Sequence, residues 1–94
     1  MRLRSDERIE SNIATVARIP ATGVEVEVVN VSDWGCRIAT PNSGLQVGAT
    51  ILVRLTDQDE VAGQIVWVHR KQCGVRFNSA VSDEVLDEIV LNMG

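Results

Sequence analysis

Apolar residues alternate with polar residues over much of this chain, which is the pattern of strands that bury one face. The clearest run, residues 24–29, alternates valines with Glu25 and Glu27. We interpret the valines as facing a core and the two glutamates as facing water. Shorter apolar runs predict further strands at residues 13–18, 35–39, 51–55, 61–68 and 73–77.

A helical period occurs only near the C-terminal end. The apolar stripe of this period consists of Val85, Leu86, Ile89, Val90 and Met93. Ser82 precedes it as an N-cap, and acidic residues follow where the helix dipole favours them. We therefore expect a helix at residues 82–93 that covers one open end or face of the sheet, and a contact between two copies of the chain is the alternative use.

Pairing every edge strand would close these strands into a barrel. The predicted fold class is all-β with one terminal helix, a six-stranded antiparallel β-barrel plus a C-terminal α-helix. We expect Gly63 to form a bulge or bend and Trp67 to lie in the core. We expect Leu45 and Val47 to pack across one end of the barrel.

Length and charge limit the possible functions. The chain has 94 residues, which predicts one domain, and its formal net charge is −4. An acidic domain is poorly suited to DNA or RNA, because binding to long polyanions depends on many contacts from Lys and Arg. A small anionic ligand remains compatible with this charge, since it needs only a few local cations.

The two cysteines, Cys36 and Cys73, are expected to be reduced and packed in a cytoplasmic protein. The sequence shows no apolar signal segment and no run long enough for membrane insertion. The one histidine, His69, and the two cysteines provide at most three ligands, whereas a structural zinc site has about four. We find no nucleophile–base pair either, so we expect no enzyme, no catalytic residue, no metal and no cofactor.

Two polar stretches carry the candidate chemistry. The first is Asn30-Val31-Ser32-Asp33-Trp34-Gly35, between two predicted strands, and local chemistry alone explains it as a turn. The second is Arg4-Ser5-Asp6-Glu7-Arg8, which a solvated charged terminus would also explain. Arginine nevertheless suits phosphate oxygens and the O6/N7 edge of guanine, because its planar fork donates two parallel hydrogen bonds.

Taken in order, these stretches form an R-x-x-x-R pair followed by a D/N-x-S-x-x-G corner, which resembles the PilZ domain family. The resemblance extends over almost the whole chain. Its later parts are Gly63-Gln64-Ile65-Val66-Trp67 and Cys73-Gly74-Val75-Arg76-Phe77, which are similar to the last two strands of that family. The resemblance implies the barrel fold predicted above and a receptor for the bacterial second messenger cyclic di-GMP.

The resemblance also implies roles for individual residues. Arg4 and Arg8 would bind phosphate and guanine from a flexible N-terminal arm, residues 1–12, attached to the barrel and helix of residues 13–94. Asn30 would bind a guanine edge, Ser32 would contact the ligand or lock the corner, and Gly35 would leave room for the ligand. The arm would order over the ligand and thereby signal to a partner.

Three further residues are secondary candidates. Many family members carry another arginine where this chain has Leu3, a position that bears on whether one ligand molecule or a stacked pair is bound. Leu3 favours one molecule, and Arg2 lies close enough to act in its place. Trp34 could stack on a guanine or pack beneath the arm.

The implied partners are cyclic di-GMP and an unidentified effector protein. The alternative is a PilZ-like adaptor that contacts proteins without binding the nucleotide, although such members usually lack the arginines or the corner, and both are present here.

Overall fold

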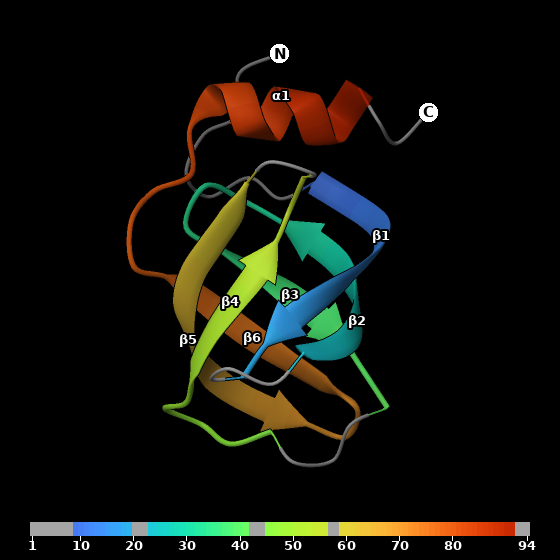
Figure 1. The fold of residues 1–94 in the computed structure, drawn as a ribbon, viewed down its shortest axis with the longest axis vertical. Coiled ribbons are helices and arrows are strands. Elements are labelled where there is room, and N and C mark those ends of the chain that lie inside the picture. The colour runs from blue at the N-terminus through green and yellow to red at the C-terminus, as the bar shows by residue number, and fades with distance from the viewer. Residues whose placement is uncertain (1–8, 20–22, 42–44, 57–58, 92–94) are drawn as a thin grey trace.

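The computed structural model describes residues 9–19, 23–41, 45–56 and 59–91. Within these ranges the chain forms six strands and one helix (Figure 1). The elements in chain order are β1 (Ile9–Arg18), β2 (Gly23–Val31), β3 (Gly35–Ala39), β4 (Thr50–Arg54), β5 (Glu60–His69), β6 (Gln72–Phe77) and α1 (Asp83–Leu91). The predicted fold class is confirmed.

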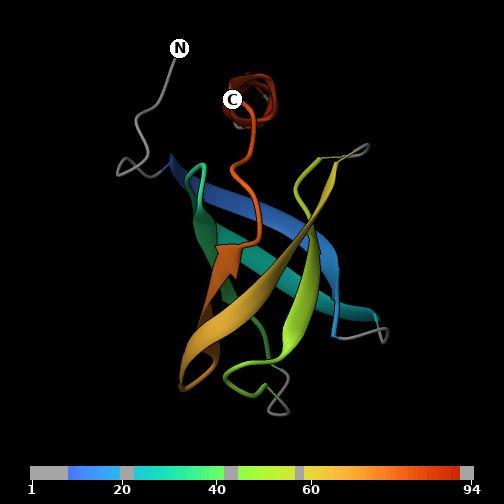
Figure 2. The ribbon, with the colours of Figure 1, turned by 90° about the vertical axis from the view of Figure 1, so that its left-hand side faces the viewer.

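The strands form a closed barrel in the order β1-β2-β3-β6-β5-β4, and every neighbouring pair is antiparallel. Closure depends on a short pairing of β1 with β4, in which Ala17 and Arg18 lie opposite Val53 and Leu52. Outside the barrel, Arg18 also forms an ion pair with Glu60. The strands curve around one interior (Figure 2), and each of the six has a paired neighbour on both edges.

The barrel interior is filled mainly by β-branched residues, whose stiff side chains pack well on a pleated surface. Val28, Ile38, Ile51, Val53 and Ile65 are among its fully buried members. The valines of the alternating run behave as predicted, because Val26 and Val28 are buried while Glu25 and Glu27 are exposed.

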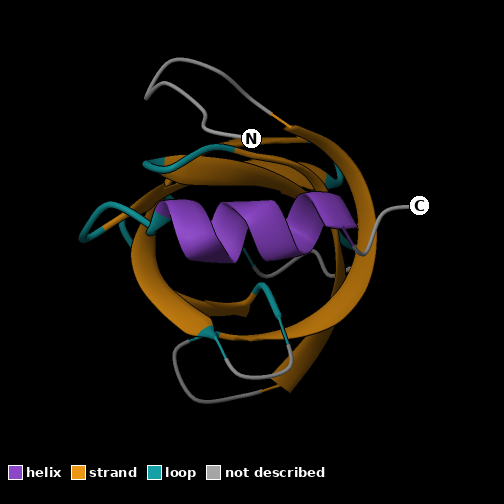
Figure 3. Cartoon of the chain, turned by 90° about the horizontal axis from the view of Figure 1, so that it is seen from above, coloured by secondary structure: helices purple, strands orange, loops and turns teal. Residues whose placement is uncertain are grey.

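The helix α1 lies across one open end of the barrel (Figure 3). Ser82 caps it as predicted, since its Oγ accepts a hydrogen bond from the Val85 amide at 3.3 Å. Leu86 and Ile89 are buried in the core, whereas Leu91 at the helix end is 79% exposed. In the described part of the chain, no helix has the length and apolarity needed to cross a membrane.

Three expectations about individual residues were wrong. Trp67 is not in the core but 40% exposed, and Val47 is 65% exposed, although Leu45 does pack against the core. Gly63 pairs regularly with Ile51 and Phe77, and the irregular step of β5 lies between Ile65 and Trp67 instead.

The first strand begins at Ile9, four residues earlier than the apolar pattern indicated. Residues 9 and 10 pair with Val31 and Asn30 of β2, and residues 9–12 of the expected arm therefore belong to β1. The rest of the expected arm, residues 1–8, lies outside the described residues.

Candidate functional site

One row of residues crosses five strands of the barrel wall. Trp67 of β5 lies opposite Gly74 of β6, and Gly74 lies opposite Arg37 of β3. Arg37 in turn lies opposite Asn30 of β2, which lies opposite Glu10 of β1. The register shifts in three of the strand pairs, and each shift adjoins a member of this row. Bulges of this kind are frequent beside functional sites, because they redirect side chains.

The shift in β2 determines where Asn30 lies. A strict period of two would place Asn30 on the same face as Val26 and Val28, which fill the core. The irregular step between Val28 and Asn30 turns Asn30 to the outer face, and the following Val31 enters the core instead. Asn30 is still only 6% exposed, and it lines a pocket on this side of the barrel.

The corner between β2 and β3 is closed by its own hydrogen bonds. The Ser32 amide donates to the Gly35 carbonyl at 2.8 Å, and the Ser32 Oγ lies 3.4 Å from both that carbonyl and the Trp34 amide. Ser32 is buried. Its hydroxyl therefore lies within reach of two backbone groups of the turn.

Gly35 permits a close approach between β3 and β6. A Cβ atom at this position would lie 2.4 Å from the Val75 carbonyl oxygen, which is closer than any side chain tolerates. The space beside Gly35 is thus taken by the neighbouring strand, and glycine is required here by the pairing of β3 with β6.

These residues surround a cavity of about 530 Å³ on the outer wall of the barrel. Its lining consists of Asn30, Ser32, Trp34, Gly35, Cys36, Arg37, Val66, Trp67, Gly74, Val75 and Arg76. We call this cavity the wall pocket. The four predicted site residues inside the described ranges, Asn30, Ser32, Trp34 and Gly35, therefore meet in one place. The other four, Arg2, Leu3, Arg4 and Arg8, lie outside the described residues.

Trp67 forms an aromatic wall of the pocket. A Cβ atom on Gly74 would lie 2.0 Å from the Trp67 Nε1 atom, so the indole covers the space that a side chain at Gly74 would need. We missed this role because the apolar run of β5 favoured a core position. The exposed Val66 next to Trp67 shows that the alternation breaks here, and the glycine opposite was the available signal.

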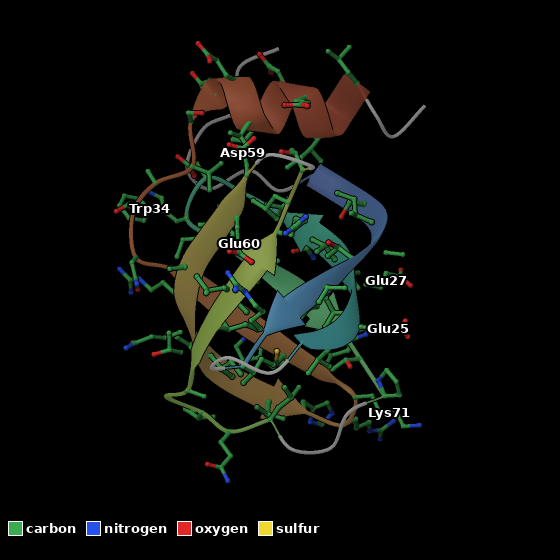
Figure 4. The ribbon with its side chains drawn as sticks, viewed as in Figure 1. Glu25, Glu27, Trp34, Asp59, Glu60 and Lys71 are labelled. Carbon is green, nitrogen blue, oxygen red and sulfur yellow. The ribbon has the colours of Figure 1, made fainter. Side chains whose placement is uncertain are left out.

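Trp34 is the second aromatic residue of the wall pocket and is 45% exposed. It lies on the side of the barrel away from Glu25 and Glu27 (Figure 4). Two arginines, Arg37 and Arg76, also line the pocket and were not singled out from the sequence. The pocket thus combines an amide, a hydroxyl, two indoles and two guanidinium groups.

Both cysteines are free and buried, as predicted. Burial raises the pKa of the Cys73 thiol from 9.0 to about 11, because the thiolate would lose its hydration. Such a thiol is neutral at physiological pH and a poor nucleophile. This agrees with a packing role for Cys73 in the barrel interior.

Comparisons with known proteins agree with this geometry. The family model described as the PilZ domain matches residues 2–92. An uncharacterized Legionella protein of known crystal structure has the same fold, with a TM-score of 0.55 and 11% sequence identity over 92% of this chain and 89% of that protein. No curated protein shows a significant match to this chain. Because the family model spans the whole barrel and helix, the chain belongs to the PilZ domain family.

Proposed function

We propose that this protein is a receptor for cyclic di-GMP, which it binds in the wall pocket. PilZ domains form a family of cyclic di-GMP receptors that act by binding rather than by catalysis. The observation that carries the proposal is the meeting of Asn30, Ser32 and Gly35, the three motif positions of the corner, at a pocket of about 530 Å³.

The chemistry of the ligand fits the groups around the pocket. Cyclic di-GMP presents two phosphodiesters, each with one negative charge, and two guanine bases. An asparagine amide both donates and accepts hydrogen bonds, so Asn30 can pair with a guanine edge. Arg4 and Arg8 would supply forked donors to a phosphate or to guanine O6 and N7.

The two tryptophans offer flat surfaces for the bases. Stacking of a base on an aromatic side chain contributes about 1–3 kcal/mol in single-stranded nucleic-acid binding, and every base has a face that can stack. Trp67 is held over Gly74 at one side of the pocket, and Trp34 lies at the corner on another. We propose that Trp67 stacks on a guanine, and that Trp34 stacks or packs under residues 1–8.

The signal would come from the N-terminal segment. We propose that residues 1–8 close over the bound ligand, and that an effector protein recognises the closed form. Ordering a segment costs conformational entropy, which contacts with the ligand must offset. Limited proteolysis measures this step, since closure predicts slower cleavage within residues 1–8 when cyclic di-GMP is present.

Calorimetric titration of the purified protein with cyclic di-GMP tests the proposal. We expect binding by the unaltered protein, none with GTP, and a loss of at least about tenfold in affinity in the Arg8→Ala variant, the usual size for a charge-assisted hydrogen bond. Arg54→Ala is the matched control, because Arg54 is exposed on β4 and does not line the wall pocket.

The fitted stoichiometry would distinguish one ligand molecule from a stacked pair. No heat and no thermal shift at high ligand concentration would refute nucleotide binding and leave the protein–protein adaptor as the function. Equal losses in Arg8→Ala and Arg54→Ala would indicate a general charge effect and would contradict the assigned role of Arg8.

A further inference from the structure

We infer that Arg37, with Arg76 diagonal to it, is a fixed phosphate-binding group built into the barrel wall. This inference rests on the proposed function and adds a second source of positive charge to it. Arg4 and Arg8 would reach the ligand from the N-terminal segment, whereas Arg37 and Arg76 are part of paired strands at the pocket itself.

Four positions on β3 and β6 lie on the outer face of the barrel. Gly35 lies opposite Arg76, and Arg37 lies opposite Gly74. Cys36 and Val75, between them, are buried in the core. Because side chains alternate along a strand, the outer face of this strand pair carries two arginines on one diagonal and two glycines on the other. No side chain of β3 or β6 therefore stands between the two arginines, where the Trp67 indole lies over Gly74 and the Val75 carbonyl adjoins Gly35.

Arg37 is held closely at this position. It is only partly exposed. Gly74 of β6 lies between Arg37 of β3 and Trp67 of β5, and the Trp67 indole covers it. The Nε atom of Arg37 is buried, and no group in the described ranges accepts its hydrogen bond. A buried donor without an acceptor is unfavourable, so an acceptor from a bound ligand that reached this Nε would be stabilised there.

Arg18, another described arginine, shows the contrast. It lies on a different part of the barrel wall, where its Nε donates to Glu60 at 3.1 Å. Its positive charge is therefore matched within the protein. Arg37 lines a pocket that has no carboxylate among its lining residues, and its Nε has no acceptor in the described ranges.

A phosphodiester is the acceptor that this arrangement fits best. The guanidinium fork matches two phosphate oxygens, and binding an anion to a protein of net charge −4 requires local cations. Arginines on paired strands are already positioned, so they lose less freedom on binding than an arm that must order. We assign one phosphodiester of cyclic di-GMP to Arg37, with Arg76 at the more exposed side of the pocket.

The test is titration of cyclic di-GMP into Arg37→Gln, Arg37→Lys and Arg76→Gln at several salt concentrations. Lys71→Gln is the matched control, because it removes one cation from the β5–β6 hairpin, away from the pocket lining. We expect Arg37→Gln to weaken binding by about 10- to 100-fold, the range for a hydrogen bond to a charged group. It should also weaken the salt dependence, and Arg37→Lys should keep part of both.

The outcomes separate the two proposals. Normal binding by the unaltered protein and by Arg37→Gln would overturn this inference and leave the receptor function intact. No binding by the unaltered protein would overturn both. A loss of affinity in Arg37→Gln with an unchanged salt dependence would show a structural role and would also overturn the inference. Unfolding curves without ligand show whether Arg37→Gln is folded. If it is not, the salt dependence of cyclic di-GMP binding by Arg76→Gln, whose residue is exposed on the same wall, decides the question.

Discussion

A single missing side chain decides how the wall pocket is built. Gly74 has no Cβ atom, so the Trp67 indole can lie across β6 and face the pocket. Trp67 itself faces outward because the register of β5 and β6 shifts between Ile65 and Trp67. Both features are needed, because the register shift turns the ring outward and the glycine leaves space for it.

We predict that Gly74→Ala displaces the Trp67 indole. The added methyl group would overlap the ring, and overpacking of this kind costs about 1–3 kcal/mol. Urea unfolding measures this cost, and tryptophan fluorescence reports the movement of the ring. In a Trp67→Ala background the same substitution should cost much less, because the overlapping atoms are gone. An equal cost in both backgrounds would show that the glycine is required for another reason.

At the scale of elements, the corner between β2 and β3 also holds the connection from the barrel to α1. The Asp33 carbonyl accepts a hydrogen bond from the Val81 amide at 2.7 Å, and the Trp34 carbonyl accepts one from the Phe77 amide at 2.8 Å. Val81 immediately precedes Ser82, the cap of α1. The corner that contributes Trp34 to the pocket is therefore joined by backbone hydrogen bonds to the end of β6 and to the residue before the helix cap.

The helix contributes to stability through its buried face. We predict that Leu86→Ala lowers the free energy of unfolding by about 2–5 kcal/mol, because it leaves a cavity against the core. Leu91→Ala removes the same atoms from a side chain that is 79% exposed, so it should change stability by less than about 0.5 kcal/mol. Urea unfolding of the two variants measures the difference, and similar losses would mean that α1 does not cover the barrel in solution.

At the scale of the whole molecule, few groups titrate at alkaline pH, so the dependence of the free energy of unfolding on pH is simple to interpret there. The chain has no tyrosine and one lysine, Lys71. Arginines stay charged throughout this range. Between pH 9 and pH 11 few groups other than the thiols can titrate, and the raised pKa of Cys73 then becomes visible in the stability of the fold.

We predict that stability falls as the pH rises above 9. In the unfolded chain the Cys73 thiol loses its proton near pH 9.0, whereas in the fold it keeps the proton until about pH 11. The unfolded state therefore binds fewer protons in this window, which lowers the free energy of unfolding with rising pH, by on the order of 2 kcal/mol in total. Urea unfolding from pH 8 to pH 10.5 measures the slope. Cys73→Ala should flatten it, and a slope that is unchanged in that variant would contradict the assignment.

The sequence by itself determined the elements and the motif. Alternation of apolar and polar residues identified all six strands, although their ends moved by a few residues, and the helix and its Ser82 cap followed from the stripe around Leu86 and Ile89. These features depend on residues that are close along the chain. The corner residues Asn30, Ser32 and Gly35 were identified for the same reason, because their motif is contiguous.

Only the tertiary structure decided which other residues join that corner. Arg37 and Arg76 are 39 positions apart, and they meet because β3 pairs with β6 across the barrel. Trp67 was assigned to the wrong face because it lies in an apolar run, which does not reveal the register shift between Ile65 and Trp67. Shifts of this kind arise from pairing between strands and from the closure of the barrel, and a pattern read along one strand contains no information about its partner.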